Sequence, residues 1–480
     1  MRKTIPLPSP PSNIVAHLLL GLIPVGARQA KEGSRRFGMT SLLVALLVLG
    51  VFVFASPAMA QETNGWKDSD EGKKLIERAD QILSITEGFR GIPVTYPVKK
   101  GLMIKDELKA VLLDKLGEEM TDVEINNEAK VLKQLGLMPA DLDYKAFMVD
   151  LLTEQIAGFY DDDTESLYIM EDQAPALLDA VLSHELFHAI QDQRFGIKAL
   201  REGGEENGDL MNARVALIEG DALAVMIDFG LHPNGTFTDI PGFEKMIRAS
   251  MTLTEGLGGE KLESAPLVIR EMLTFPYMDG LFFIAALKRK GGWEAVNTVY
   301  AAPPSSTEQI LHPEKYEVRE EPTTVRFTLP AAFVDQRRLV YDNISGELGL
   351  YLFLKSHFVE ALGGSSDSAR ATTGWGGDRT LAYESSTGQV TVFIVSDWDS
   401  EEDAIEFANA VAEVSAFRTP DAAVRSVNGP SFSGLLREDR TQVWLERRGS
   451  EVLYIDGLAP DEAVSLSALR DEIWLTRSLD

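Results

Sequence analysis

Val181–Gln193, with the sequence VLSHELFHAIQDQ, contains the pattern His-Glu-x-x-His at His184, Glu185 and His188. Side chains four residues apart lie on one face of a helix, so His184 and His188 can direct two imidazole nitrogens at one point. Neutral imidazole is a good zinc ligand. Glu185 follows His184 by about 100° of helix rotation, close enough to act on a water at the metal without coordinating the ion. The residues between are apolar, so the stretch predicts a buried helix with one polar seam whose groups need partners.

A second apolar segment with helical periodicity, residues 213–226, carries Glu219, which lies 31 residues after His188. A polar loop separates the two segments, so we expect the helices to pack face to face and to place Glu219 beside the histidines. Two histidines and one glutamate leave a fourth position open, which is the ligand count of a catalytic zinc site. The sequence therefore predicts one Zn²⁺ ion held by His184, His188 and Glu219. The alternative is that hydrogen bonds satisfy the histidines and that Glu219 pairs with Arg214.

Residues 184–188 and 219–222 (Glu-Gly-Asp-Ala) resemble the gluzincin class of zinc metallopeptidases. Residues 140–320 also look like a group of secreted bacterial proteins with a peptidase-like core. In that group a Gly-Phe-Tyr-Asp stretch precedes the motif, as at residues 158–161 here, and Leu-His-Pro-Glu-Lys-Tyr follows it, as at residues 311–316. The resemblance implies a mainly helical, zincin-like core that hydrolyses peptide bonds.

In such an enzyme Glu185 is the general base. The sequence departs from the family at one position. Thermolysin-like gluzincins carry an aspartate four residues after the glutamate ligand, where it orients a ligand histidine, but here that position is Leu223. Asp221 lies two residues after the ligand and points elsewhere on the helix. Asp192, one turn after His188, is a second candidate for orienting a histidine.

Zinc peptidases need a hydrogen-bond donor for the oxyanion of the tetrahedral intermediate, usually a tyrosine or a histidine. His312, which follows a short helix and is held by Pro313, is our first candidate. Tyr277 is the second candidate and Tyr316 the third. For His312, a role in packing the loop is the alternative.

Residues 158–170 predict two short strands joined by an acidic turn. In gluzincins an edge strand before the motif helix binds extended substrate by main-chain hydrogen bonds, so this hairpin is the expected peptide-recognition element. An ordinary hairpin is the alternative. The run Asp161-Asp162-Asp163 lacks the ligand spacing and the glycine of a calcium loop, and we interpret it as a solvated turn.

The first 60 residues have the pattern of a secretory signal peptide. Basic residues precede a short apolar run at 42–55, and Ala58-Met59-Ala60 follows it, which predicts cleavage after Ala60 and an exported, periplasmic or extracellular protein. An uncleaved membrane anchor is the alternative; after cleavage we expect no stable membrane insertion. The net charge is −28, and residues 1–60 contribute six basic and one acidic side chain, so the remainder carries −33. This charge disfavours nucleic acid as a partner. The absence of cysteine excludes disulfides and thiolate metal sites.

The fold class that we predict is α+β. After the leader at 1–60, we expect a helical region at 61–140 that wraps the catalytic core and whose Thr121 and Glu124 have capping-box spacing. A zincin-like metallopeptidase core at 141–320 and a smaller α+β domain of unknown role at 321–480 follow. The predicted function is that of a secreted zinc peptidase acting on peptides or proteins. A non-catalytic zinc-binding or assembly protein and a zinc hydrolase of non-peptide substrates are the alternatives, and the sequence does not indicate the oligomeric state.

Overall fold

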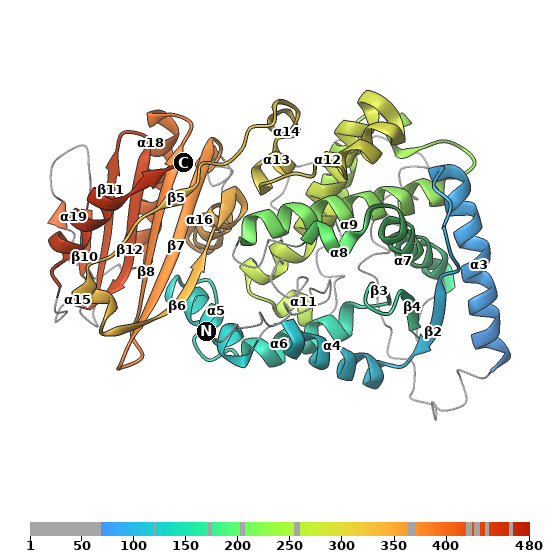
Figure 1. Cartoon of the computed structure of the whole chain (residues 1–480), viewed down its shortest axis with the longest axis horizontal. Helices are drawn as coiled ribbons and strands as arrows, with labels where there is room; N and C mark the ends of the chain where they lie inside the picture. Colours follow the sequence, from blue (N-terminus) through green and yellow to red (C-terminus); the bar gives the residue numbers. More distant parts are fainter. Residues whose placement is uncertain are drawn as a thin grey trace, which may run out of the picture.

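Helices and sheets both contribute to the structure, a computed structural model, and the fold class is α+β as predicted. Figure 1 shows a mainly helical half beside a half that is built on one large sheet. The predicted signal peptide lies outside the described residues. No helix in the described part of the chain is long and apolar enough to cross a membrane. The structure describes residues 69–119, 121–170, 175–201, 207–253, 260–362, 370–418, 425–426, 433–436, 441–459 and 464–480.

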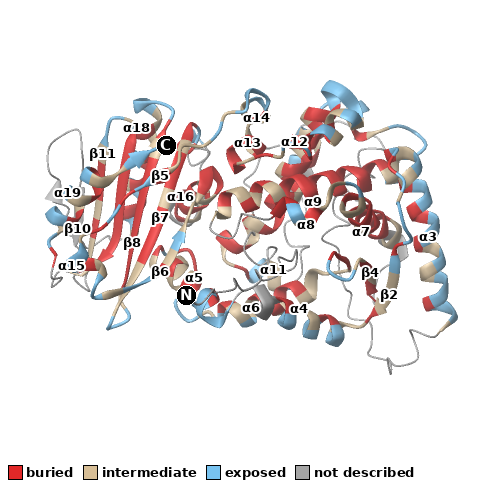
Figure 2. Cartoon of the chain, viewed as in Figure 1, coloured by how far each residue is buried: buried red, intermediate tan, exposed pale blue. Residues whose placement is uncertain are grey.

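The chain from Asp70 to Val318 forms mainly helices. The two longest are α9 and α12, and Figure 2 shows α9 buried over most of its length. A cap closes the start of several helices, among them the predicted capping box of Thr121 and Glu124. The helices are α3 (Asp70–Arg90), α4 (Lys105–Glu119), α5 (Asp122–Gln134), α6 (Tyr144–Gln155), α7 (Pro175–Phe195), α8 (Ile197–Arg201), α9 (Gly208–Leu231), η2 (Phe237–Asp239), α10 (Phe243–Leu253), α11 (Glu260–Ser264), α12 (Leu267–Val299), α13 (Thr307–Leu311) and α14 (Pro313–Val318).

A small three-stranded sheet lies beside α7 in the order β2-β4-β3, with bounds Lys99–Met103, Ser166–Met170 and Gly158–Asp161 respectively. Strand β2 runs parallel to β4, whereas β3 and β4 form the antiparallel hairpin that the sequence predicts. Strand β3 is therefore an edge strand and contacts the motif helix.

The acidic turn of this hairpin is solvated only in part, so our interpretation of it was wrong for two of the three aspartates: Asp163 and Thr164 are exposed, but the other two aspartates are not. Asp161 and Asp162 are both buried. Lys115 Nζ donates to Asp161 at 2.7 Å, and the Arg201 guanidinium pairs with Asp162. These cations come from α4 and α8, distant in sequence from the turn, and local composition does not reveal them.

The second half is built on a seven-stranded sheet in the order β6-β7-β8-β12-β11-β10-β9. Its central strands are buried on both faces, because alternate side chains of β8 enter different apolar clusters: Val392 and Ile394 join the large core, and Phe393 and Val395 the smaller one. The elements are β5 (Val325–Arg326), α15 (Ala331–Val334), β6 (Arg337–Asn343), α16 (Gly346–Leu362), β7 (Trp375–Ser385), β8 (Val390–Trp398), α18 (Glu401–Arg418), β9 (Arg425–Ser426), β10 (Ser433–Leu436), β11 (Gln442–Arg448), β12 (Glu451–Leu458), α19 (Leu466–Thr476) and β13 (Ser478–Leu479).

Helix α5 differs in part from our expectation, because it packs on this sheet as well as on α6 of the helical half. It contacts β6 and β8, and at its end the Gln134 side chain donates to Asp456 at 2.7 Å while Arg418 donates to the Gln134 carbonyl at 2.6 Å. An apolar helix face shows that a helix packs on something, but not on which core. The large hydrophobic cluster accordingly contains residues from both sides of position 320.

Helices α9 and α12 meet backbone to backbone at two glycines. A Cβ added to Gly220 would lie 2.2 Å from the Gly280 carbonyl carbon, and one added to Gly280 would lie 2.2 Å from the Ala216 carbonyl oxygen. Helix α12 continues through this point and contains Pro276. Glycine is used here because the two backbones are in contact, not because the helix ends.

We predict that Gly220→Ala destabilises the protein by about 3 kcal/mol, because a methyl group at this crossing has no space and the helices must separate. Chemical denaturation measures the change in the free energy of unfolding. Gly88→Ala in α3 is the matched control, since nothing lies within 4 Å of the added Cβ. It should stabilise the protein by up to about 1 kcal/mol. Equal stability of the two variants would contradict the close crossing.

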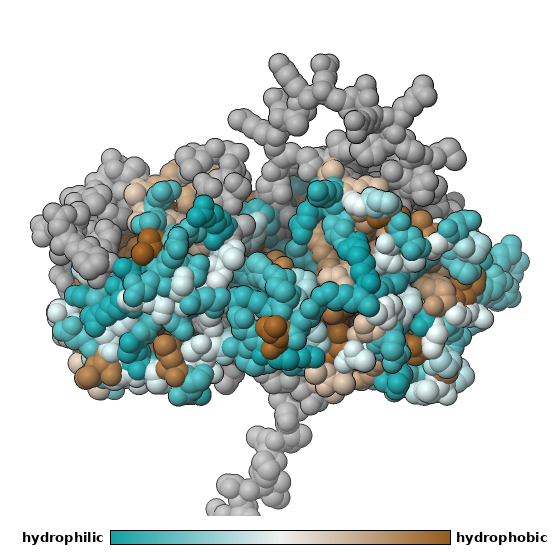
Figure 3. Space-filling model, turned by 90° about the horizontal axis from the view of Figure 1, so that it is seen from above, coloured by the Kyte–Doolittle hydropathy of each residue, from teal (hydrophilic) through white to brown (hydrophobic). Residues whose placement is uncertain are grey.

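The face of the molecule in Figure 3 is largely hydrophilic, with scattered apolar residues. Single apolar side chains of this kind are ordinary on a protein surface.

Candidate metal centre

Three side chains from two helices converge on one point. His184 and His188 come from α7 and Glu219 from α9. His184 Nε2 lies 3.1 Å from His188 Nε2 and 3.2 Å from Glu219 Oε2, and the distance from His188 Nε2 to Glu219 Oε2 is 3.4 Å. Ligands placed tetrahedrally around zinc at about 2.0–2.1 Å lie about 3.4 Å from one another. The three atoms therefore have the spacing that a shared metal ion requires.

The chemistry of this donor set also fits a divalent cation. Burial alone would raise the pKa of Glu219, but the two histidines hold that pKa well below its ordinary range, so Glu219 is a carboxylate. Burial lowers the pKa of His188, and the charge of Glu219 more than offsets this and raises it to about 9. The site thus favours positive charge between the three groups, and a metal ion supplies that charge in place of a proton.

Glu185 lies next to this centre and is partly exposed. Its Oε2 accepts a hydrogen bond from the Tyr160 backbone N–H of β3 at 3.0 Å, which fixes the direction of the carboxylate. Burial raises the pKa of Glu185, and the nearby charge of Glu219 adds to the rise. A raised pKa is what a general base near neutral pH requires.

Tyr277 reaches the same centre from α12. Its ring centroid lies 6.0 Å from that of His184, and its phenol group hydrogen-bonds to Glu219. Burial, together with the charges of Glu219 and Glu185, raises its pKa well above the usual value. Tyr277 therefore stays a neutral hydrogen-bond donor at neutral pH.

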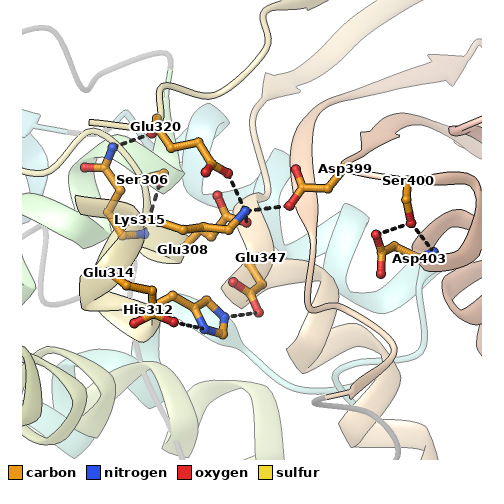
Figure 4. A network of polar contacts seen from close by, with 11 residues as sticks. Ser306, Glu308, His312, Glu314, Lys315, Glu320, Glu347, Asp399, Ser400 and Asp403 are labelled. Carbon is orange, nitrogen blue, oxygen red and sulfur yellow. Dashed lines mark hydrogen bonds and ion pairs between the residues drawn. The ribbon is translucent and has the colours of Figure 1, made fainter. Parts of the chain in front are cut away.

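His312 lies in a different network, so the structure does not bring our first oxyanion candidate to the centre. Figure 4 shows its ring between Glu347 and Glu314. His312 Nε2 lies 3.0 Å from Glu347 Oε1, and Nδ1 lies 4.0 Å from Glu314. The turn before Pro313 directs this ring towards α16 rather than α7. Tyr316, the third candidate, donates to the Ala302 carbonyl.

Two other acidic groups in the described residues have metal-like spacing, and each already holds a lysine. Lys115 lies among the aspartates of the hairpin turn. Lys315 Nζ lies 2.7 Å from both Glu308 and Asp399 and also contacts Glu320, as Figure 4 shows. In each of these clusters a lysine of the chain already lies among the carboxylates, unlike in the histidine and glutamate group.

Neither aspartate that we considered contacts His188. Asp192 Oδ2 accepts from the Tyr160 hydroxyl at 3.0 Å, and Asp221 pairs with Arg90. The partner of His188 Nδ1 is Gln191 Oε1 at 2.7 Å, which the sequence analysis missed. The position of Gln191, three residues after His188 on the same helix face, is the signal for this contact in the sequence, because an amide oxygen can accept from an imidazole as a carboxylate does.

Comparisons with known proteins say little about this centre. A family model described as a domain of unknown function (DUF8575) matches residues 337–468, which hold all seven strands of the large sheet. No curated protein matches the chain. Among solved structures, a protein from Chloroflexus aurantiacus described as a candidate hydrolase with a novel fold is 16% identical, with a TM-score of 0.35. That match covers 58% of this chain and 96% of the other.

We predict that His184→Ala, His188→Ala and Glu219→Ala each lose most of the bound zinc, because each removes one of three protein ligands. Elemental analysis of the purified variants, after dialysis against a weak chelator, measures the zinc content. His232→Ala is the control. His232 lies directly after α9, is exposed, and stacks on Phe89 of α3. Full zinc content in Glu219→Ala would remove that residue from the site.

Proposed function

We propose that this protein is an exported, zinc-dependent peptidase. The observation that carries the proposal is the convergence of His184, His188 and Glu219 within 3.1–3.4 Å, with Glu185 and Tyr277 beside them. The three proposed ligands are buried, while Glu185 and Tyr277 are partly exposed. Groups that hold a metal are thus shielded, and groups that would act on a substrate are accessible.

Bound zinc would polarise a carbonyl group and lower the pKa of a water to about 7. The side chains of the chain supply the remaining chemistry. Glu185, held by the Tyr160 N–H, is placed to accept a proton from the attacking water and to pass it to the leaving amine. Tyr277, neutral because of its raised pKa, can donate a hydrogen bond to the developing oxyanion.

A peptide substrate is supported by strand β3. One of its edges pairs with β4, and its other side faces the motif helix, where Tyr160 contacts Glu185. An extended peptide that added to this edge would pass close to Glu185, and main-chain hydrogen bonds would bind it. The net charge of −28 disfavours nucleic acid as the substrate.

Two other functions share the same site: a zinc-binding scaffold without activity and a zinc hydrolase of non-peptide substrates. Glu185 favours an enzyme, because holding a metal does not require it. Cleavage of casein and of a broad peptide library by the zinc-loaded protein, with and without chelator, tests the proposal. Chelator-sensitive cleavage supports a peptidase, whereas zinc binding without any cleavage contradicts it.

We predict that Glu185→Gln keeps its zinc but loses at least about 10²-fold in kcat, since proton transfer by a positioned base contributes roughly 10²–10⁴-fold. The change should affect kcat more than KM, because the amide retains the size of the side chain. Peptide cleavage and zinc content are measured side by side, with the exposed Glu314→Gln as the control. If Glu185→Gln loses its zinc, the role of Glu185 is structural and the assignment fails.

We also predict that the mature protein begins at Gln61, because Ala58 and Ala60 have the spacing of a signal-peptidase site after a short apolar run. N-terminal sequencing of protein recovered from the periplasm or medium checks this. A retained leader in the membrane fraction would show an anchored protein instead.

A further inference from the structure

A buried side-chain amide, that of Gln191, contacts the His188 ring at the nitrogen that faces away from the proposed metal site. His188 Nδ1 lies 2.7 Å from Gln191 Oε1, on the side of the ring opposite to the nitrogen that faces Glu219. Gln191 is fully buried, and its amide nitrogen donates to the Ile218 carbonyl at 2.9 Å and to the Tyr300 hydroxyl at 2.7 Å. It thus joins the motif helix to α9 and α12.

These partners fix which end of the amide faces the histidine. The Ile218 carbonyl can only accept a hydrogen bond, so the NH₂ group of Gln191 must point towards it. The amide oxygen is then left for His188, and an oxygen can only accept. It follows that His188 Nδ1 carries a proton and donates it to Gln191.

A neutral imidazole with its proton on Nδ1 has its lone pair on Nε2. In His188 this is the atom that lies 3.1 Å from His184 Nε2 and 3.4 Å from Glu219 Oε2. The contact with Gln191 therefore selects the tautomer that can bind a metal at the centre, and also sets the direction of the ring.

Three more residues continue the same arrangement. The Tyr300 hydroxyl donates to Asp221 Oδ2 at 2.8 Å, which leaves its oxygen able to accept from Gln191. Arg90 Nη2 donates to the same carboxylate at 3.1 Å, and both side chains of this pair are fully buried. Arginine can only donate, so the direction of each hydrogen bond is defined along the whole series that runs from Arg90 through Asp221, Tyr300 and Gln191 to His188.

We propose that Gln191 is a positioning residue for the metal centre: it holds His188 in the metal-binding tautomer, and Tyr300, Asp221 and Arg90 hold the Gln191 amide. The inference rests on the proposed function in that His188 is a metal ligand. A neutral amide on the motif helix here does the work that a carboxylate on the second helix does in the family that the sequence resembles. Through Tyr300, Asp221 and Arg90, the Gln191 amide also connects the end of α3 to the metal centre.

The main test compares two changes at Gln191. Gln191→Met keeps the size but removes the acceptor for His188, and losing such a partner typically lowers metal affinity about 10–100-fold. Gln191→Glu keeps an acceptor for His188 but loses the donors to Ile218 and Tyr300. Zinc affinity, measured by competition with a chromophoric chelator, should fall about 10–100-fold in Gln191→Met and clearly less in Gln191→Glu. Equal losses would mean that Gln191 only links the helices, and would overturn the proposal.

Gln193→Met is the matched control. Gln193 lies on the same helix, but its amide bonds to the backbone of Thr95 and Tyr96, so zinc affinity should stay unchanged. Thermal unfolding of the metal-free variants shows whether each one folds. If Gln191→Glu does not fold, Tyr300→Phe takes its place: it removes one partner of the amide and should weaken zinc binding less than Gln191→Met does. A loss in Tyr300→Phe as large as that in Gln191→Met would overturn the proposal.

A second readout needs neither zinc nor activity. Long-range ¹H–¹⁵N spectra of the metal-free protein, recorded above the His188 pKa of about 9 so that this ring is neutral, report which ring nitrogen of a histidine is protonated, and the chain has only six histidines. His188 should have its proton on Nδ1 in the wild type and lose this preference in Gln191→Met. A proton on Nε2 in the wild type would overturn the proposal. A wild type with the expected tautomer that binds no zinc would instead refute the proposed function and leave the role of Gln191 in the tautomer intact.

Discussion

The contact between Gly220 and Gly280 determines where the groups of the candidate metal centre can lie. Gly220 directly follows Glu219, and Tyr277 precedes Gly280 by three residues, so the crossing of α9 and α12 places the phenol against the carboxylate. A side chain at either glycine would force the two backbones apart and move both groups away from the histidines. Tyr300, the C-cap of α12, reaches Asp221 and Gln191 after a separate break of the helix at Gly291 and Gly292. The close crossing thus positions a proposed metal ligand and a hydrogen-bond donor, and the break brings back the residue that supports a second proposed ligand.

Burying so many polar groups between α7, α9 and α12 is costly unless each one has a partner. The structure meets most of this requirement with two separate charge systems, while His184 Nδ1 and Arg90 Nε have no hydrogen-bond partner among the described residues. Arg90 and Asp221 form a pair whose side chains are fully buried, and Arg90 lies over the rings of Phe187 and Trp293. Glu219 instead faces the two histidines. Buried ion pairs are weak evidence for stability, because desolvation offsets their attraction. Their directional bonds nevertheless specify how α3, α9 and α12 align.

Local spacing in the sequence predicted what a single helix can determine. The four-residue interval of His184 and His188, the position of Glu185 and the hairpin before the motif all follow from periodicity. Glu219 was predicted from its apolar, helical segment together with the ligand count of a zinc site, and Tyr277 from the need for an oxyanion donor. The prediction for His312 failed for a physical reason: a histidine beside a proline has a constrained backbone, but nothing local says which core its ring faces. Contacts such as Arg90 with Asp221, 131 residues apart, depend on how the helices pack and have no counterpart in local spacing.

The side chains of the proposed metal ligands are less exposed than those of the proposed base and oxyanion donor. The side chains of His184, His188 and Glu219 are 6%, 5% and 3% exposed, whereas Glu185 and Tyr277 reach the boundary of the core. A buried ligand set strengthens electrostatic interactions, because little water screens them. A partly exposed base can still exchange protons with solvent. The Tyr160 N–H fixes the Glu185 carboxylate on the side of the motif helix that faces β3, so the edge strand orients the proposed base.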